Sequence, residues 1–477
     1  MIPLLRRYLA PHKKVLIVIS VLLLLQAIGT LILPSLNADI INQGVVVGDT
    51  GFILQTGGVM LAVSILVGIA TVIAVYFSAR TAMRVGRDMR GDVFRNVEKF
   101  SVAQMHGFGI PSLITRNTND VQQIQMLVMI GLTMMVLAPV TAVGGVIMAL
   151  RENVQLSSIL IVTIPIMLVV IGFMVAKAIP LFRSMQVKID GVNEVLRENL
   201  SGIRVIRAFV RTKHEEARFA DANEELTDVS LRVTRLFALI MPVLMLIMNV
   251  TIVATIWFGG SLVNDGTMPI GNLLAFQSYI MQILFSVMMA VMTMMMVPRA
   301  AASAERINAV LDTEPAIAEP AAPVQHNNWA GRIELENLTF RYPGAQDPVL
   351  QGLSTVIEPG MTTAIVGGTG SGKSTLVNLL PRLLDVTSGR ILIDGVDVRD
   401  LALADLWNLF GIVPQKSFLF SGSIASNIRF GKADATDAQV WNALEIAQAS
   451  EFVAGLIDGL ESRVDQGGVN FSGGQRQ

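Results

Sequence analysis

The chain has 477 residues, of which 52% are hydrophobic and only 15% are charged, and its formal net charge is -1. This composition is too apolar for an ordinary soluble protein and predicts a membrane protein. The near-neutral charge argues against nucleic-acid binding, and the lack of cysteine excludes disulfides, thiol nucleophiles and thiolate metal sites.

Six uncharged, mostly apolar stretches are each long enough to cross the hydrocarbon core as a helix, which takes about 20 residues. Buried core helices of a large soluble protein are the alternative, but these would be shorter and amphipathic. The six predicted spans lie within Val15–Ala38, Gly51–Ala79, Val121–Leu150, Asn153–Ala176, Leu236–Asn264 and Gly266–Pro298.

Basic residues predict how the chain crosses the membrane. Lys and Arg are frequent in the N-terminus and in the segments Arg80–Asp120 and Lys177–Arg235, but absent from the connection Asp39–Thr50. By the positive-inside rule, the N-terminus and the long polar segments face the cytoplasm. We therefore expect a multi-pass protein of the cell membrane whose N-terminus and C-terminal domain are cytoplasmic.

The long polar segments mix apolar and charged residues at helical spacing, so the membrane helices are expected to continue into the cytoplasm. Each segment contains a short polar break, Phe108–Val121 in the first and Glu198–Phe209 in the second. A turn or a small transverse helix could protrude at each break and touch another domain. Ordinary solvated loops are the alternative.

The composition changes after a helical run that ends at Leu311. Residues 313–328 (TEPAIAEPAAPVQHNN) contain several prolines and alanines and predict an extended linker. Beyond the linker, the segment Gly331–Tyr342 alternates apolar and polar residues as a strand does.

A glycine-rich segment further on fits the pattern G-x-x-x-x-G-K-[ST]. It follows an expected apolar strand, Thr363–Val366, and precedes an expected helix, Ser374–Leu384, which is the context that a phosphate-binding loop requires. Lys373 is expected to reach the β and γ phosphates of a nucleotide and the Ser374 hydroxyl to bind Mg²⁺. The predicted ATP site in this segment comprises Gly367, Gly368, Thr369, Gly370, Ser371, Gly372, Lys373, Ser374 and Thr375.

The predicted fold class is therefore multidomain. A six-helix, all-α transmembrane domain with long cytoplasmic extensions occupies residues 1–312, and the linker 313–328 leads to an α/β P-loop nucleotide-binding domain in residues 329–477. Tyr342 could stack on adenine in this domain, although it could equally be a packing residue. Gln415, which follows an apolar strand-like triplet, could reach the metal or the attacking water, although a glutamine in that place is often structural.

Taken together, the six spans, Tyr342, GGTGSGKST, VPQKSFLFSGSIASNI and FSGGQ resemble an ATP-binding cassette exporter of the half-transporter kind. The resemblance runs over essentially the whole chain. It implies ATP and Mg²⁺ as cofactors, a second half-transporter chain that is either identical or different, and catalytic roles for Lys373 and Gln415. It also implies that two polar breaks are coupling helices, and that the signature turn completes the ATP site of the partner chain; the turn is Ser472, Gly473, Gly474 and Gln475.

One departure from the family follows the signature. Relatives continue into a strand with an Mg²⁺-binding Asp, a catalytic Glu and a switch His, and none of these is in this sequence. We therefore interpret the sequence as truncated at its C-terminal side and expect the chain as given to be inactive in ATP hydrolysis.

Uncharged polar residues inside the spans, among them Asn249, Gln277 and Gln282, could line a substrate cavity beside the methionines of Met281–Met296. The same methionines could instead face lipid or neighbouring helices. The predicted function is ATP-driven export of hydrophobic or amphipathic compounds by alternating access, as in multidrug exporters. A lipid or peptide substrate, a nucleotide-gated channel and a regulatory subunit with a degenerate ATP site are the alternatives.

Overall fold

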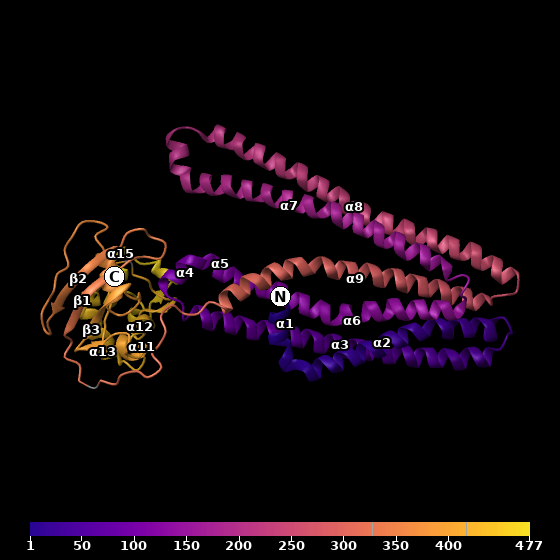
Figure 1. Cartoon of the computed structure of the whole chain (residues 1–477), viewed down its shortest axis with the longest axis horizontal. Helices are drawn as coiled ribbons and strands as arrows, with labels where there is room; N and C mark the ends of the chain where they lie inside the picture. The colour runs from indigo at the N-terminus through magenta and orange to yellow at the C-terminus, as the bar shows by residue number, and fades with distance from the viewer. Residues whose placement is uncertain (327, 416) are drawn as a thin grey trace. The chain divides into compact units, whose positions relative to one another are not determined.

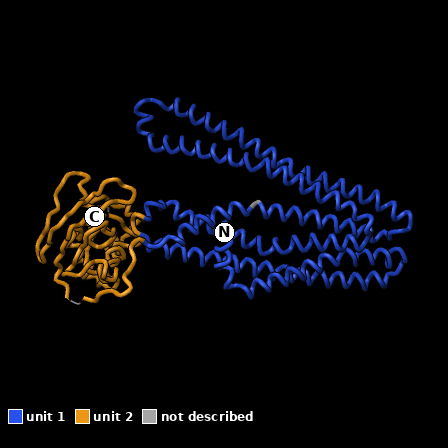
Figure 2. Tube along the Cα trace, in the orientation of Figure 1, with its two compact units in different colours: residues 1–100, 104–315 blue, residues 101–103, 316–477 orange. Residues whose placement is uncertain are grey.

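The computed structural model describes residues 1–326, 328–415 and 417–477. It divides into two compact units, residues 1–100 with 104–315 and residues 101–103 with 316–477 (Figure 2). In the predicted linker, residues 313–328, Asn327 lies outside the described residues, and the other positions form neither helix nor strand.

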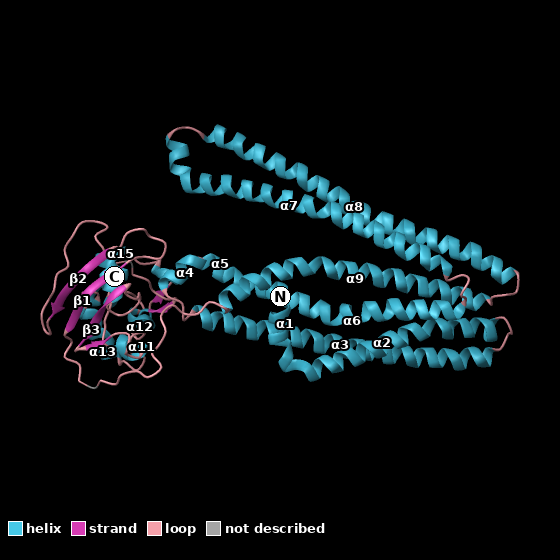
Figure 3. Ribbon diagram, in the orientation of Figure 1, coloured by secondary structure: helices cyan, strands magenta, loops and turns pink. Residues whose placement is uncertain are grey.

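The first unit is built from helices (Figure 3). Within the described residues, six helical stretches are long and apolar enough to cross a membrane, one at each predicted span. Four of them contain the predicted stretch, whereas the fourth and sixth begin a few residues later than predicted, at Ser158 and Ile270. The long runs are possible because a helix satisfies all its backbone polar groups internally. The helices are α1 Ile2–Leu9, α2 Lys13–Asp39, α3 Thr50–Val97, α4 Val102–Phe108, α5 Ile110–Thr115, α6 Val121–Glu152, α7 Ser158–Ala208, α8 Thr212–Asn264 and α9 Ile270–Leu311.

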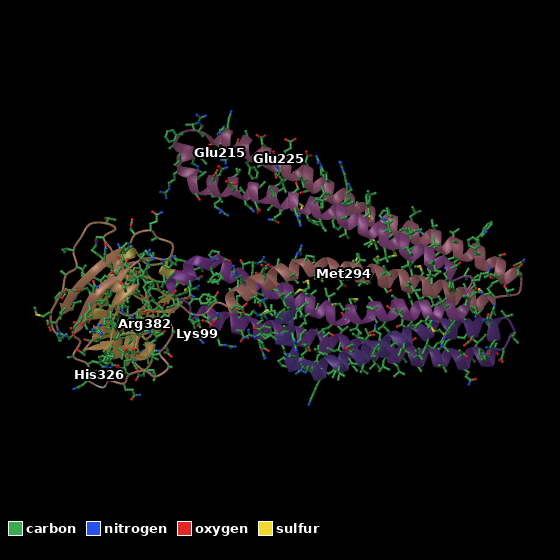
Figure 4. The ribbon with its side chains drawn as sticks, viewed as in Figure 1. Lys99, Glu215, Glu225, Met294, His326 and Arg382 are labelled. Atoms are coloured by element: carbon green, nitrogen blue, oxygen red, sulfur yellow. The ribbon has the colours of Figure 1, made fainter. Side chains whose placement is uncertain are left out.

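Helices α2, α3, α6 and α9 pack side by side, whereas α7 and α8 form a hairpin that diverges from them towards its polar end (Figure 1). In the diverging part the two helices are joined by ion pairs. Lys188 Nζ of α7 lies 2.6 Å from Glu225 Oε2 of α8, a residue labelled in Figure 4. The ion pairs join α7 to α8 in this part, whereas the apolar part of the hairpin shares a buried core with α9.

Helices α6 and α9 approach each other closely. A Cβ added at Gly145 of α6 would lie 2.7 Å from Ile283 Cγ1 of α9. Small residues allow such close approach in membrane domains, where van der Waals packing drives helix association. Beside this contact the fully buried Tyr279 donates its hydroxyl to the Leu31 carbonyl of α2 over 2.9 Å.

The far end of this bundle is tied by a chain of polar contacts. Asn272 Nδ2 of α9 donates to Glu152 Oε2 of α6 over 2.7 Å, and Asn42 Nδ2 donates to Asn272 Oδ1 over 2.7 Å. The Gly271 amide donates in turn to Asn42 Oδ1 over 2.8 Å. Three helical stretches are thus joined at the end opposite to the polar extensions.

The two polar breaks differ in structure. The first contains α5, which begins after Gly109 with a φ of 76° and continues through a π-helical turn, Arg116–Asp120, into α6. The second is not a break, because α7 is helical through Ala208 and the turn lies at 209–211. One glycine, Gly202, costs about 1 kcal/mol in a helix and does not end it. The last turns of α7 bend across the end of the hairpin (Figure 1).

The second unit contains a four-stranded antiparallel sheet in the order β2-β1-β3-β4. The predicted strand within Gly331–Tyr342 is confirmed as β1, at the centre of this sheet. A smaller pair, β5 with β6, lies apart from it. The strands are β1 Ile333–Phe340, β2 Leu350–Ile357, β3 Ser388–Ile393, β4 Val396–Asp397, β5 Gly422–Ser423 and β6 Arg463–Val464.

Short helices complete the unit. Leu376 and Leu379 of α10 are buried in one core with Leu338 of β1 and Leu406 of α11, which fixes α10 against the sheet. The helices are α10 Lys373–Leu379, α11 Leu403–Asn408, α12 Ile424–Ile428, α13 Asp437–Ile446, α14 Ser450–Ala454 and α15 Gly473–Arg476.

Three local predictions for this unit are wrong. Thr363–Val366 is exposed and is not a strand, and the triplet Gly411–Val413 is not a strand either. A strand needs a neighbour for its backbone groups, and the four strands of the described sheet pair only with one another. The expected helix Ser374–Leu384 ends early, at Leu379, because Pro381 has no N–H with which to continue the helical hydrogen bonds.

Candidate nucleotide-binding site

The glycine-rich loop between β2 and α10 has a backbone that glycine makes possible. Gly370 and Gly372 have φ values of 83° and 86°, and Gly372 is the N-cap of α10. A Cβ at Gly372 would lie 2.8 Å from Leu350 Cδ2 and 3.0 Å from Val349 Cγ1. The loop therefore requires glycine there, for both its conformation and its space.

Lys373 closes the loop with its ammonium group. Its Nζ donates to the carbonyl oxygens of Gly367 and Gly368, at 2.8 and 2.6 Å, and to Ser371 Oγ at 3.3 Å. All three ammonium protons thus point to neutral acceptors, so the positive charge is not neutralised within the loop. A half-buried cation that pairs only with neutral groups, in a loop with two left-handed glycines, suits a polyphosphate, and the residues present fit the phosphates of a nucleotide.

Tyr342 lies beside this loop. Its hydroxyl is 3.0 Å from Thr375 Oγ1 in the first turn of α10, and its ring meets the edge of the Phe340 ring at a centroid distance of 4.9 Å. Tyr342 remains 39% exposed. The structure thus brings together the predicted aromatic residue and the predicted phosphate loop, and leaves part of the ring accessible to a base.

No hydrogen bond in the described residues connects Ser374 and Gln415, the two residues predicted to bind the metal. Ser374 is exposed in the first turn of α10, and Gln415 is exposed in an irregular segment. In the described part of the chain, no hydrogen bond connects Gln415 to the glycine-rich loop, and no group of three His, Asp or Glu side chains could hold a metal ion. Mg²⁺ at this site would therefore need the phosphate oxygens of the nucleotide as further ligands.

The signature turn forms the start of α15. Ser472 Oγ accepts a hydrogen bond from the Gln475 amide over 3.3 Å, and Gln475 Oε1 accepts one from the Ser472 amide over 2.9 Å. This reciprocal capping box fixes the turn. Gly473 and Gly474 are exposed, and a Cβ at either would meet open space. The turn is thus preformed and accessible.

A carboxylate outside the loop fixes the start of the sheet. Asp394 accepts hydrogen bonds from the amides of Ala330, Gly331 and Arg332 over 2.8, 3.0 and 2.9 Å. Desolvation alone would raise the pKa of Asp394, but these three donors outweigh it and hold the pKa below its ordinary value. Sequence reasoning missed this contact because it joins segments that are distant in the chain.

A second candidate site lies in the helical unit. Gln26, Gln282 and Thr141 line one pocket of about 210 Å³ between α2, α6 and α9. Gln282 was predicted to line a cavity, whereas Gln26 was not, although a lone amide within an apolar stretch is a signal that could have found it. Gln277 and Asn249 do not line this pocket.

Known proteins match the chain in both units. The family described as "ABC transporter transmembrane region" matches residues 16–287, and the one described as "ABC transporter" matches residues 350–477. An uncharacterised ABC transporter ATP-binding protein of Mycobacterium tuberculosis is 46% identical over 481 aligned residues, which cover 100% of this chain and 82% of that protein.

A fatty acid ABC transporter ATP-binding/permease protein of Mycobacterium bovis is 32% identical, over 92% of this chain and 70% of that protein. Among solved structures, a bacterial Atm1-family ABC exporter with ATP bound superposes with a TM-score of 0.76 and 23% identity, over 99% of this chain and 82% of that one. The latter likeness concerns the fold.

Proposed function

The chain belongs to the ABC transporter family, and we propose that it is one half of a dimeric exporter that uses ATP to move hydrophobic or amphipathic compounds out of the cell. One observation carries the proposal. The chain that provides six membrane-length helices also provides a loop in which the Lys373 ammonium lies 2.6–2.8 Å from the carbonyls of Gly367 and Gly368, ready to exchange them for phosphate oxygens.

We assign ATP to the loop and its neighbours. Lys373 would bind the β and γ phosphates, the backbone amides of the loop would surround them, and the accessible part of the Tyr342 ring would stack on adenine. Ser374 and Gln415 would hold Mg²⁺, which supplies charge neutralisation on the phosphates when it is bound. We assign residues 329–477 to the nucleotide-binding domain, residues 1–312 to the membrane domain and residues 313–328 to the linker between them.

The partner is a second half-transporter, identical or different. The preformed turn at Ser472 supports a role in a neighbouring chain, because Gly473 and Gly474 are exposed and, in the described residues, no hydrogen bond joins the turn to the loop at Lys373. The hairpin of α7 and α8, which diverges from the rest of its own unit (Figure 1), also supports a partner chain that packs against it.

We propose that the N-terminus and the ATP site face the cytoplasm, because Lys and Arg are concentrated in the segments on that side. Substrate would then pass outwards by alternating access. An amphipathic substrate agrees with the similarity to the fatty acid ABC transporter of Mycobacterium bovis, and a lipid is the first alternative to a drug-like compound.

Nucleotide-dependent closure of the dimer tests the proposal, and the readout does not require hydrolysis. The chain contains no cysteine, so two introduced cysteines, Thr369→Cys in one copy and Ser472→Cys in the other, report on a single contact. With MgATP and a mild oxidant, the mixed pair is expected to form a disulfide-linked dimer on a non-reducing gel.

Three controls make the result specific. Neither single variant alone should give the product, and adding Lys373→Ala to both copies should remove the ATP dependence. A cross-link that forms equally well without nucleotide would contradict the proposed split site. ATP-dependent closure without accumulation of substrate in inverted vesicles would favour a regulatory subunit or a gated channel instead.

A further inference from the structure

The pocket between α2, α6 and α9 contains two side-chain amide oxygens without a hydrogen-bond donor among the described residues. Gln26 Oε1 and Gln282 Oε1 are buried and, within the described chain, neither has a hydrogen-bond partner. Both side chains line the pocket of about 210 Å³. An unsatisfied carbonyl oxygen away from water costs about 1–3 kcal/mol in proteins, so two of them at one site call for a ligand or a functional reason.

The orientation of Gln282 follows from its surroundings. Its Nε2 faces the Thr30 carbonyl of α2 at 3.5 Å, so its oxygen is the atom left over. Turning the amide around would place two oxygens against each other. The acceptor character of Gln282 in this pocket is thus set by α2.

The hydroxyl groups around the pocket have already used their protons. Each donates to a main-chain carbonyl oxygen of its own helix: Thr30 Oγ1 to that of Gln26 over 2.8 Å, Thr141 Oγ1 to that of Leu137 over 2.7 Å, and Ser286 Oγ to that of Ile283 over 2.7 Å. Each hydroxyl therefore has only lone pairs left to offer a ligand. The hydroxyls reinforce the acceptor character of the two glutamine oxygens.

The apolar side chains of the pocket favour a positively charged ligand over a neutral hydrogen-bond donor. Phe285, which is 56% exposed, lines the pocket together with Met134 and Met289. An aromatic face attracts an ammonium group, and the thioether of methionine is polarisable and adaptable. No Asp, Glu, Lys or Arg lines this pocket. The cation would thus be bound by dipoles and ring faces, without a counter-charge.

Both glutamines lie near the middle of their predicted spans. Gln26 is 11 residues after Val15 and 12 before Ala38, and Gln282 is 16 residues from both Gly266 and Pro298. Polar groups at this depth are costly in a bilayer and commonly mark substrate pathways. A pocket of about 210 Å³ is smaller than the roughly 300–1,000 Å³ that enclose a drug-sized ligand, so it would accommodate a head group.

We propose that this pocket binds the protonated primary or secondary amine of an otherwise apolar substrate, with its N–H groups donated to Gln26 Oε1 and Gln282 Oε1. This inference rests on the proposed export function and names the class of compound that would be exported. It distinguishes amines that still carry N–H groups from quaternary cations, which have the same charge and no donor.

Two matched fluorescent probes test the proposal: 1-naphthylmethylammonium, and its N,N,N-trimethyl analogue. Binding of each is measured by fluorescence anisotropy to the full chain in lipid nanodiscs, against empty nanodiscs. The wild type is expected to bind the ammonium probe at least about tenfold more tightly, as hydrogen bonds to charged groups contribute about 1.5–3 kcal/mol.

Variants then locate the site. Gln26→Leu and Gln282→Leu should each weaken the ammonium probe by about tenfold and leave the trimethyl probe unchanged. Gln277→Leu is the matched control, since it makes the same exchange on α9 outside the pocket. Gln26→Glu should tighten ammonium binding, a gain that misfolding cannot produce.

Equal binding of the two probes by the wild type, or equal losses in Gln277→Leu and Gln282→Leu, would overturn the proposal. Because these measurements contain no nucleotide, they do not depend on the ATP site. Lys373→Ala should bind both probes as the wild type does, so failure of the amine site and failure of the proposed ATP-driven function give different results.

Discussion

Arg306 Nε of α9 donates to Asp120 Oδ2 over 2.7 Å, and Asp120 has no exposed surface. Asp120 Oδ1 also accepts a hydrogen bond from Ser303 Oγ over 3.0 Å. The Arg306 side chain, in contrast, is 46% exposed. The ion pair is therefore asymmetric, with one charge that can turn to water and one that cannot.

This asymmetry predicts unequal effects of removing each partner. Arg306→Met leaves a buried carboxylate without a counter-charge and should lower the unfolding free energy by about 3 kcal/mol. Asp120→Ala frees an arginine that can reach solvent and should cost about 1 kcal/mol. Thermal and denaturant unfolding of the chain in nanodiscs would measure both. The double variant should be less destabilised than the sum, and strictly additive losses would show that the pair is not coupled.

The ring of Tyr342 is predicted to bind the base of ATP. Tyr342→Phe loses the hydroxyl contact with Thr375 but keeps the ring, so ATP affinity should fall by less than threefold. Tyr342→Ala should lose about 1–3 kcal/mol of binding, the contribution of stacking on one base.

Inorganic tripolyphosphate, which has no base, separates stacking from a packing role. Its affinity, measured by calorimetry, should be the same in wild type and Tyr342→Ala. If both ligands weaken together in that variant, the ring supports the loop and does not contact adenine.

The Gly372 position should not accept any side chain. Gly372→Ala must take a left-handed conformation, which costs roughly 1–2 kcal/mol, and its Cβ would come within 2.8 Å of Leu350 Cδ2. We expect lower thermal stability and loss of ATP binding. Gly411→Ala is the control, as its φ is not positive and a Cβ there meets open space. Comparable losses in the two variants would contradict the prediction.

Asp394 is predicted to make the second unit less stable in acid. Because the folded-state pKa of Asp394 is lowered by three amide donors, its contribution is fully present above its ordinary pKa of 3.8 and is lost as the pH falls through the folded value. Asp394→Ala should reduce stability by about 1–2 kcal/mol at pH 7, in line with the loss of a charged hydrogen-bond acceptor.

Melting temperatures of the wild type and Asp394→Ala, followed between pH 7 and pH 3 by tryptophan fluorescence, would check this. The difference between the two should shrink towards the acid end. A difference that stays constant over the whole range would mean that the carboxylate charge does not contribute.

The sequence predicted best those elements whose backbone groups are satisfied locally. The apolar stretch Val15–Ala38 had to become a helix in a membrane, whatever its neighbours, and α2 covers it. The strand Thr363–Val366 was predicted from its apolar residues alone. A strand also depends on a neighbouring strand to pair with, and the local sequence does not show whether one is present. Local periodicity therefore determined helices better than strands.

The candidate sites divide in the same way. The loop at Lys373 is contiguous, so its residues could be read directly from the motif. The nearness of Tyr342 to Thr375, and of Gln26 to Gln282, depends on packing between distant segments. Composition and spacing carry no information on such pairs, which is why Gln26 was missed and the partner of the Tyr342 hydroxyl was unforeseen.

Helix α9 carries both Gln282 of the proposed amine pocket and Arg306 of the ion pair, and Pro298 lies between them. Pro298 has no N–H to give to the carbonyl of Met294, the exposed residue labelled in Figure 4, so the helix is easiest to bend there. At 1.5 Å rise per residue, Gln282 lies about 24 Å from that point, and a bend of about 5° would carry its amide sideways by about 2 Å. A displacement of that size would bring Gln282 Oε1 into or out of hydrogen-bond reach of the proposed ammonium group.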